Sequence, residues 1–442
     1  MDQQKVKQFF KIVSRCIAYS LLILLFTTCK KEVVSEKISY SGIKYYQSGN
    51  SDKVNKVEKT ADGGFIFCGS TGNDSNRLDA FMMKVNAAGE REWYHTYGGI
   101  YFDEFEHAIQ CSDGGYLAVG TTNSIGEGIV FDNLQKEDYI VKTNSQGIIE
   151  WQKSYFVSTC SMEYVKEITK NEYLMVGQYS AGNRNIAMQK LDNNGNLKEF
   201  KYFPAQDSFP PLRDRNSWNE FANFIGTTAD GSIFIGGVMD RSNRLVEVQK
   251  HITYMMKLDK SRFDSVSFFY AYPDYMREYF YWLGTNFQRV PIVKIVSTND
   301  GYYIGTYLEL PGTKMVMQLL KTDLTGKLIW QKQYSGLGNA MFYDMLLHSD
   351  GSLLLAGSST SDVMNFGFLE AFENTKAMVL KVDPNGNELW TSYVGGNENA
   401  TIAKCIKANG DQFIIAGLTS LSSSGVDKML TYKINANGKL AL

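Results

Sequence analysis

Seven copies of one sequence pattern run through this chain, and they constrain its fold more strongly than any other feature. Each copy opens with a polar turn and an apolar run that ends in glycine, as in DGSLLLAG at residues 350–357. A lysine inside a second apolar run comes next, and a polar turn then leads into an aromatic segment, as in DPNGNELW at residues 383–390. The marker lysines of the seven copies are Lys84, Lys142, Lys190, Lys257, Lys321, Lys381 and Lys433. A period of about 50 to 60 residues, with several strands and no helical pattern, is typical of β-propeller blades.

The turn residues divide each copy into strands. Asp-Gly and Asn-Gly pairs between apolar runs indicate two-residue hairpin turns, because these residues adopt positive φ at low steric cost. In the second copy, residues 105–111 would form the inner strand, followed by YLAVGTT, DYIVKT and IEWQKSYF. We therefore predict an all-β chain that folds as one seven-bladed β-propeller of four-stranded antiparallel blades. The predicted blades are approximately 50–99, 100–157, 158–205, 206–273, 274–336, 337–396, and 397–442 plus 37–49.

The two ends of the repeat region complement each other. The last copy stops at Leu442, where the other copies enter their outer strand. Before the first copy, ISYSGIKYYQSG at residues 38–49 looks like an outer strand without a blade of its own. We predict that this amino-terminal strand completes the seventh blade, which would close the ring and remove exposed strand edges.

The amino terminus carries a processing signal. Basic residues precede Ile17–Phe26, an apolar run of ten residues, about half of what a bilayer-spanning helix needs. The segment LFTTC, which ends at Cys29, resembles the lipobox of bacterial lipoproteins, in the looser form of the Bacteroidetes type. We predict a signal peptide at 1–28, lipidation of Cys29, a tether at 29–36 and the propeller at 37–442. The alternative is an ordinary cleaved signal with an incidental cysteine.

A lipid anchor on Cys29 would hold the protein at the outer membrane without spanning it. Lipoproteins that face the cell surface can carry an acidic run after the cysteine, and here only Glu32 follows it. The sequence therefore leaves open whether the protein faces the periplasm or the cell surface.

Composition and spacing exclude several function classes. A net charge of −2 with 21% charged residues gives no overall attraction to nucleic acid. The cysteines show no CxxC spacing, and the four histidines are scattered along the chain. We therefore predict no metal site and no cofactor. Neither a G-x-S-x-G elbow nor a P-loop occurs, so we assign no catalytic residue.

The aromatic part of the repeat carries a family resemblance. DPNGNELW at residues 383–390 resembles the tryptophan-docking repeat of PQQ-type propellers, and Lys37 to Leu442 resembles bacterial propeller lipoproteins of the WD40/PQQ-like class. The resemblance implies the fold and says little about function. Four tryptophans lie nine residues after a marker lysine: Trp93, Trp151, Trp330 and Trp390. They could form a carbohydrate-stacking set, but their constant spacing favours packing between blades.

The marker lysines allow two interpretations. They could form a ring that binds an anionic ligand. The alternative, which we favour, is that their stems pack while the amines reach the rim or a backbone carbonyl. Likewise, the turns that begin at Asp192 and Asp383 superficially resemble calcium loops, but they lack EF-hand spacing and read as hairpin turns.

Long loops are the candidate functional sites. The segment from the marker glycine to the marker lysine varies from 13 to 24 residues, and this variation would fall on one face of the propeller. The longest insertions are 124–138, 240–251, 361–376 and, between blades, 273–289. Exposed aromatics with arginine are typical of interface anchors, although the aromatics of 273–289 could instead plug the ring. The predicted partner-binding residues are Tyr275, Arg277, Tyr279, Phe280, Tyr281, Trp282, Phe287, Phe366, Phe368 and Phe372.

These features predict a non-catalytic binding or scaffolding lipoprotein of the bacterial envelope. Its partner would be a protein of an outer-membrane complex, an expectation that rests on the fold. Glycan binding is a second interpretation. A propeller enzyme that uses the central cavity, such as a PQQ-type dehydrogenase or a polysaccharide lyase, is a third.

Overall fold

The computed structural model describes much of the chain from residue 42 onward. The described residues are 42–46, 48, 51–74, 77–125, 137–155, 160–180, 184–203, 218–228, 231–243, 248–258, 266–272, 293–310, 314–360, 375–395, 399–421 and 427–441. They belong to one compact unit, Ser41–Leu442, and the predicted signal peptide, Cys29 and the tether lie outside them. None of the described residues forms a helix, so no helix among them could cross a membrane.

The regular elements of the described ranges are β-strands, in seven groups. Blade one contains β2 (Ser51–Lys59), β3 (Phe65–Asp74), β4 (Arg77–Val85) and β5 (Arg91–Tyr97). Blade two contains β6 (Asp103–Gln110), β7 (Tyr116–Thr122), β8 (Glu137–Thr143) and β9 (Ile149–Tyr155). Blade three contains β10 (Cys160–Thr169), β11 (Glu172–Ser180), β12 (Arg184–Leu191) and β13 (Leu197–Phe203). Blade four contains β14 (Trp218–Thr227), β15 (Ile233–Asn243), β16 (Val248–Leu258) and β17 (Val266–Tyr272). Blade five contains β18 (Lys294–Thr298), β19 (Gly301–Leu310), β20 (Lys314–Thr322) and β21 (Leu328–Tyr334). Blade six contains β22 (Asn339–Leu347), β23 (Leu353–Thr360), β24 (Lys376–Val382) and β25 (Glu388–Val394). Blade seven contains β26 (Asn399–Asn409), β27 (Gln412–Leu421), β28 (Asp427–Ile434), and the short strands β1 (Ile43–Tyr46) and β29 (Leu440–Ala441).

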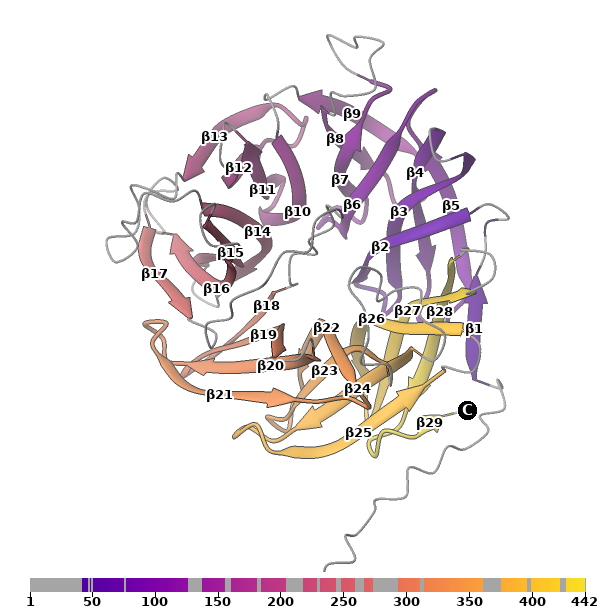
Figure 1. Cartoon of the computed structure of the whole chain (residues 1–442). Helices are drawn as coiled ribbons and strands as arrows, with labels where there is room; N and C mark the ends of the chain where they lie inside the picture. Colours follow the sequence, from indigo (N-terminus) through magenta and orange to yellow (C-terminus); the bar gives the residue numbers. More distant parts are fainter. Residues whose placement is uncertain are drawn as a thin grey trace, which may run out of the picture. The chain divides into compact units, whose positions relative to one another are not determined.

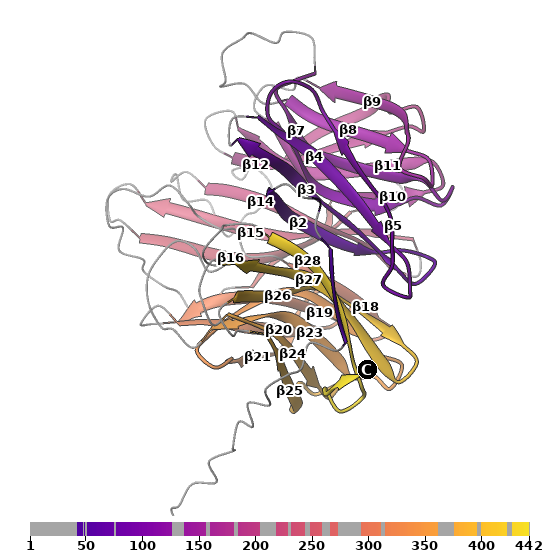
Figure 2. The same ribbon diagram turned by 90° about the vertical axis from the view of Figure 1, so that its right-hand side faces the viewer.

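The blades form a ring, which confirms the predicted seven-bladed propeller (Figure 1). Blades two to six are separate four-stranded antiparallel sheets in which each strand pairs with the next along the chain. Figure 1 shows the first strand of each blade innermost and the fourth outermost. Blades one and seven share one sheet, because β2 pairs with β28 at Asp52 and Asp427. The view from the side shows these two strands next to each other (Figure 2).

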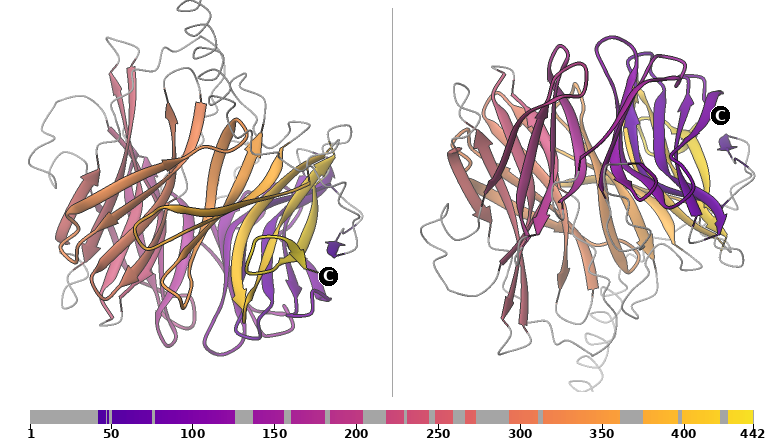
Figure 3. Two further views of the ribbon diagram at one scale, coloured as in Figure 1. Left: turned by 90° about the horizontal axis from the view of Figure 1, so that it is seen from below. Right: turned by 90° about the horizontal axis from the view of Figure 1, so that it is seen from above.

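The seventh blade takes its outer strand from both ends of the propeller. β1 pairs antiparallel with one end of β28, and β29 pairs with the other end. Tyr46 lies opposite Met429, which precedes the marker Lys433 by four residues. In blade one, Tyr97 likewise lies opposite Ala80, which precedes the marker Lys84 by four residues. The predicted closure by an amino-terminal strand is therefore confirmed, and Figure 3 shows the indigo and yellow ends side by side. The prediction assigned this outer strand to the amino-terminal segment alone. In the structure, the two residues of β29 at the carboxyl-terminal end also pair with β28.

The turns at the ends of the third strands are closed by their own side chains. In the turn after β24, Gly386 has φ 76° and its amide donates to Asp383 O at 2.9 Å. Asp383 Oδ1 accepts hydrogen bonds from the amides of Asn385 at 2.9 Å and Asn387 at 2.7 Å. Because this carboxylate satisfies backbone amides of its own loop, the segment is a hairpin turn and not a calcium loop.

The middle strands of each blade form the core. Every residue of β7, β8 and β23 is buried, since neighbouring blades cover both faces of these strands. Such two-sided burial fixes each blade against the next. The inner strands are therefore held in defined positions around the centre of the ring.

Candidate functional site

The inner strands bring one residue from every blade to an equivalent position near the centre of the ring. A β-bulge shifts the inner-strand pairing at the same place in six blades, as between Phe105 and His107 in β6. In blade two, the marker Lys142 pairs with Leu117 of the second strand. The residue after the bulge, His107, pairs with Val119, which is two positions further along the same second strand. We call this place the axial position. It is occupied by Lys56, His107, Tyr164, Phe224, Lys294, Asp344 and Cys405.

Six side chains from blades one to six are linked by direct contacts, and we call them the axial circuit: Glu58, His107, Tyr164, Phe224, Lys294 and Asp344. The first five close a loop, and Asp344 joins it through Lys294. His107 Nε2 lies 3.1 Å from Glu58 Oε1, and its ring stacks on Tyr164 with 3.9 Å between centroids. Tyr164 packs on Phe224 at 5.5 Å, and Lys294 Nζ lies 5.4 Å from the centroid of Phe224. Lys294 Nζ is also 3.3 Å from Asp344 Oδ1 and 3.8 Å from Glu58 Oε1. The last contact joins blade five to blade one and closes the circuit.

His107 is fixed in one tautomer. Its side chain is fully buried, and the amide of Val165 donates to Nδ1 at 3.2 Å. Because Nδ1 accepts this bond, the ring proton lies on Nε2 and is donated to Glu58 Oε1. Burial lowers the pKa of His107, although Glu58 opposes the shift. A neutral imidazole with both nitrogens engaged joins blades one, two and three, and it offers no free lone pair to a substrate.

Three members of the axial circuit carry charge. Burial opposes ionisation of Glu58, but Lys294 and the His107 hydrogen bond hold its pKa below the usual value. Burial also opposes ionisation of Asp344, where Lys294 and Lys59 lower the pKa. The pKa of Lys294, which burial alone would lower, is raised well above its usual value by Asp344 and Glu58. Glu58 and Lys294 keep 19% and 20% of their side chains exposed, so the circuit remains in contact with solvent.

Two more lysines lie in this region, and neither forms an ion pair with a described residue. Lys56 occupies the axial position of blade one, and Lys166 follows Tyr164 by two residues on β10, on the same strand face. Burial lowers the pKa of both lysines, and the charge of Lys294 lowers it further.

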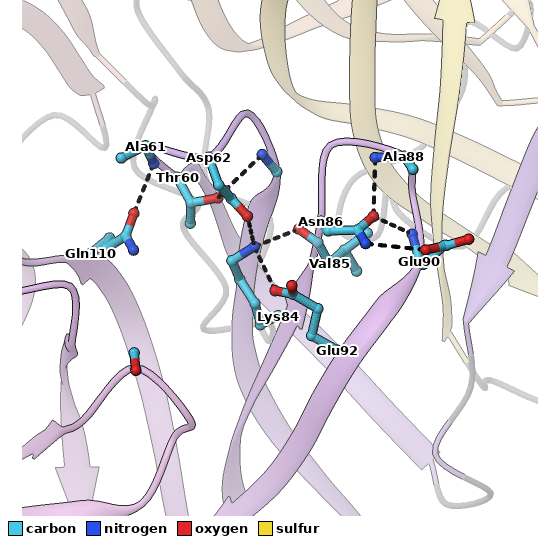
Figure 4. Close-up of polar contacts among 12 residues, drawn as sticks. Thr60, Ala61, Asp62, Lys84, Val85, Asn86, Ala88, Glu90, Glu92 and Gln110 are labelled. Atoms are coloured by element: carbon cyan, nitrogen blue, oxygen red, sulfur yellow. Dashed lines mark hydrogen bonds and ion pairs between the residues drawn. The ribbon is translucent and has the colours of Figure 1, made fainter.

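Marker lysines form ion pairs within individual blades and do not belong to the axial circuit. Lys84 Nζ donates to Asp62 Oδ2 at 2.6 Å and to Val85 O at 3.0 Å, and it lies 2.9 Å from Glu92 Oε2 (Figure 4). The pairing of a marker lysine with the acid of the first turn recurs at Lys142–Asp113, Lys321–Asp300 and Lys381–Asp350. These amines tie the third strand to the turn between the first two strands. In these four blades they are not available as an anion-binding ring.

The repeat tryptophans lie between blades. Trp151 Nε1 donates to Asn193 O at 2.9 Å in the outer turn of the next blade, and its ring covers Gly195. Trp93 and Trp390 donate to carbonyls of the next blade in the same way. Trp330 covers Gly386 of blade six. The residues predicted to bind a partner lie outside the described ranges, as does Cys29: Tyr275, Arg277, Tyr279, Phe280, Tyr281, Trp282, Phe287, Phe366, Phe368 and Phe372.

Sequence reasoning missed the axial residues. Their equivalence follows from two strand pairings and a bulge, and a linear alignment of the repeats does not reveal it. One signal was present, because charged residues interrupt inner strands that would otherwise be apolar, as in KVNKVEK at 53–59 and MEYVKEI at 162–168. Charges at the inner edge of a blade can only meet near the centre of the ring.

Comparison with known proteins supports the fold and names no family. No protein-family model matches the chain, and no curated protein matches it. Among solved structures, it resembles the polysaccharide lyase Uly1 with a TM-score of 0.52 and 11% identity, over 92% of this chain and 94% of the lyase. It also resembles the propeller domain of the Trilobed protease from Pyrococcus furiosus, with a TM-score of 0.43 and 8% identity over 87% of this chain and 98% of that domain. At these identities the likeness shows the fold alone.

One prediction needs correction. The chain was predicted not to be an enzyme, and this is contradicted by its structural likeness to an enzyme, the polysaccharide lyase, although that likeness assigns no activity to this chain. The prediction failed because it took the absence of a known catalytic motif as evidence, whereas propeller enzymes collect their residues from several blades.

Proposed function

We propose that the protein is a lipid-anchored, ligand-binding propeller of the bacterial envelope. The lipobox-like segment that ends at Cys29 supports an anchor at the outer membrane, in a lipoprotein of the Bacteroidetes type. The KKEVVSEK segment after the cysteine would serve as a tether to the propeller. Which side of the membrane the propeller faces is part of the test below.

One observation favours binding on one face over the other. The turns between the first and second strands and between the third and fourth strands lie on one face of the propeller. Polar groups on this face bond to their own blade or to the neighbouring blade. The lysine–aspartate pairs, the tryptophan–carbonyl bonds and the Asp383 turn are examples. Long loops with aromatic residues belong to the opposite face of such a meander, and loops of this length are often functional.

The proposed partner is a protein of an outer-membrane complex, bound through the loops around Tyr279–Trp282 and Phe366–Phe372. Crosslinking in native membranes followed by affinity purification would test this with Trp282→Ala and with Trp330→Phe as control, since Trp330 lies between blades. Loss of the same partner only with Trp282→Ala supports the proposal. Equal recovery with all three proteins would refute binding through this loop.

Fractionation tests the anchor separately. Wild-type protein should remain with membranes after washing at high salt, whereas Cys29→Ser should not. Proteolysis of intact cells then distinguishes the two sides of the outer membrane, because only a surface-facing propeller is cut. Retention of Cys29→Ser in the washed membranes would disprove lipid anchoring.

A second candidate is an enzyme that acts on a polysaccharide near the axis. Tyr164 favours it, because its ring is buried against His107 and its Oη has no hydrogen-bond partner among the described residues. Its ring also packs on Phe224, whose centroid lies 5.4 Å from Lys294 Nζ. A cation beside a proton-transferring hydroxyl suits abstraction of a proton next to a carboxylate. Incubation with uronic acid polymers should then yield unsaturated products, and Tyr164→Phe should abolish them. No product from any polymer tested would exclude this candidate.

A further inference from the structure

Exposed apolar side chains gather at one end of the outer strands. The first two residues of β9, β13, β21 and β25 are exposed in each case, directly after the turn that joins the third and fourth strands. Seven of the eleven large apolar side chains that are exposed in the described part of the chain lie in these turns or at these two positions. We call this set the turn rim: Ile148, Ile149, Leu197, Leu324, Leu328, Ile329 and Leu389.

The turn rim lies on one face of the propeller. In a ring of antiparallel four-stranded blades, the turns between third and fourth strands share a face, and blades two, three, five and six contribute to the rim. Acids at the same level of their outer strands are engaged within the protein, since Glu92 and Glu150 each contact a marker lysine. Single exposed aliphatic side chains are ordinary on a protein surface. Their recurrence at one level of four blades, however, gives this face an apolar border.

The amino-terminal strand begins close to the same face. Ile43, the first residue of β1, pairs with Tyr432, which is two residues from the turn end of β28 at Ile434 and five from its other end at Asp427. At the rise of a strand these separations are about 7 Å and about 17 Å. Thirteen residues separate Cys29 from Ile43, and a chain of that length spans at most about 50 Å. A lipid on Cys29 would therefore keep the turn rim within reach of the membrane.

We infer that the turn rim faces the membrane and places its aliphatic side chains at the boundary between headgroups and acyl chains. This inference rests on the lipid anchor proposed above. Each side chain contributes little alone, and the anchor raises the effective concentration of the rim at the bilayer. The rim therefore orients a tethered propeller and would not hold an untethered one. The long loops of the opposite face then point away from the membrane, toward a partner.

A single environment-sensitive fluorophore measures this orientation on the full-length lipidated protein in phospholipid vesicles. Ile329→Cys and Leu389→Cys place the label on the turn rim. Ile100→Cys and Leu337→Cys are the matched controls, because these exposed aliphatic residues lie in connections between blades, on the opposite face. All four variants carry Cys160→Ser, and the other described cysteines are buried, so the label attaches at one position.

Nitroxide-bearing lipid should remove most of the fluorescence of the two turn-rim labels and leave the two control labels unquenched. Flotation of the unlabelled protein with the vesicles is measured first, because wild-type protein that does not float refutes the anchor and not the rim. A second arm replaces Cys29 with a histidine tag on nickel-chelating lipid, which tests the rim without the natural anchor. Turn-rim labels that stay unquenched on attached protein in either arm, or equal quenching on both faces, would overturn the inference.

Discussion

Tyr46 Oη donates a 2.7 Å hydrogen bond to Gly89 O, and this bond joins the amino-terminal strand to the outer turn of blade one. The same bond links neighbouring blades elsewhere in the ring: Tyr97–Gly147 at 2.8 Å, Tyr272–Gly326 at 2.7 Å and Tyr334–Gly386 at 2.8 Å. Tyr46 thus occupies, in the seventh blade, the place of an outer-strand tyrosine. A chain of 442 residues closes its ring with the contact that it uses between consecutive blades.

Tyr46→Phe should lower the free energy of unfolding by about 1–2 kcal/mol, because it removes the bond to Gly89 O and a 2.8 Å bond to Thr431 Oγ1. Urea denaturation followed by tryptophan fluorescence measures the change. Tyr202→Phe is the control, since the Tyr202 side chain is exposed on an outer strand and should tolerate the loss of its hydroxyl. Removal of residues 38–49 should destabilise the ring more than Tyr46→Phe. Unchanged stability of this deletion would show that β1 does not contribute to closure.

Lys294→Met should destabilise the protein by about 3–5 kcal/mol, because it leaves the Glu58 and Asp344 carboxylates near the axis without their shared cation. Thermal unfolding at pH 7 measures the loss. Lys332→Met is a suitable control, because Lys332 bonds at the surface to Asn387 Oδ1. If both substitutions had equally small effects, the axial circuit would not contribute to stability.

The same circuit predicts acid sensitivity. The pKa values of Glu58 and Asp344 are lowered in the folded state, so their contribution to stability is present above the unfolded pKa of about 4 and is lost as the pH falls below it. The melting temperature of wild type should therefore decrease steeply below about pH 4. In Lys294→Met this decrease should be shallower, because the two carboxylates no longer gain from ionisation. An identical slope in both proteins would contradict the assignment.

The sequence predicted the ring and its closure because these depend on local signals that recur. Asp383 and Gly386 specify a turn by short-range chemistry, and Trp390 follows at a fixed distance, so each copy reinforces the assignment. The axial site differs in kind. His107 and Lys294 share a position only through strand pairing, and Lys294 meets Glu58 only after five blades have formed around the axis. Contacts between residues more than 200 positions apart leave no trace in repeat spacing.

Asp138→Asn should stabilise the protein at pH 8. Burial between blades two and three raises the pKa of Asp138 to about 7, although Gln189 and the amide of Met162 lower it. A raised carboxyl pKa means that wild-type stability decreases as the pH rises from about 4 to about 7. The amide avoids this loss, keeps an oxygen for the Met162 amide, and can donate to Gln189 Oε1, which has no partner among the described residues.

The expected gain for Asp138→Asn is about 2–4 kcal/mol at pH 8, and it should nearly vanish at pH 4. Chemical denaturation at both pH values measures it. The control is Asp411→Asn, at an exposed turn position, which should show no such difference between the two pH values. A variant less stable than wild type at pH 8 would mean that the charged form of Asp138 is favoured in the folded state.

Gly195→Ala should destabilise blade three and its junction with blade two by about 2–4 kcal/mol. Gly195 has φ 73°, where a side chain adds about 1–2 kcal/mol of strain. In addition, a Cβ would lie 2.6 Å from the ring of Trp151, so the docked tryptophan must move, at a cost of about 1–3 kcal/mol. Gly114→Ala separates the two effects, because Gly114 has φ 85° but nothing within 4 Å of its Cβ position. Gly114→Ala should therefore show the strain alone, and fluorescence of Trp151 should change only in Gly195→Ala. Equal losses of stability in both variants would show that tryptophan docking adds nothing to the contact between blades.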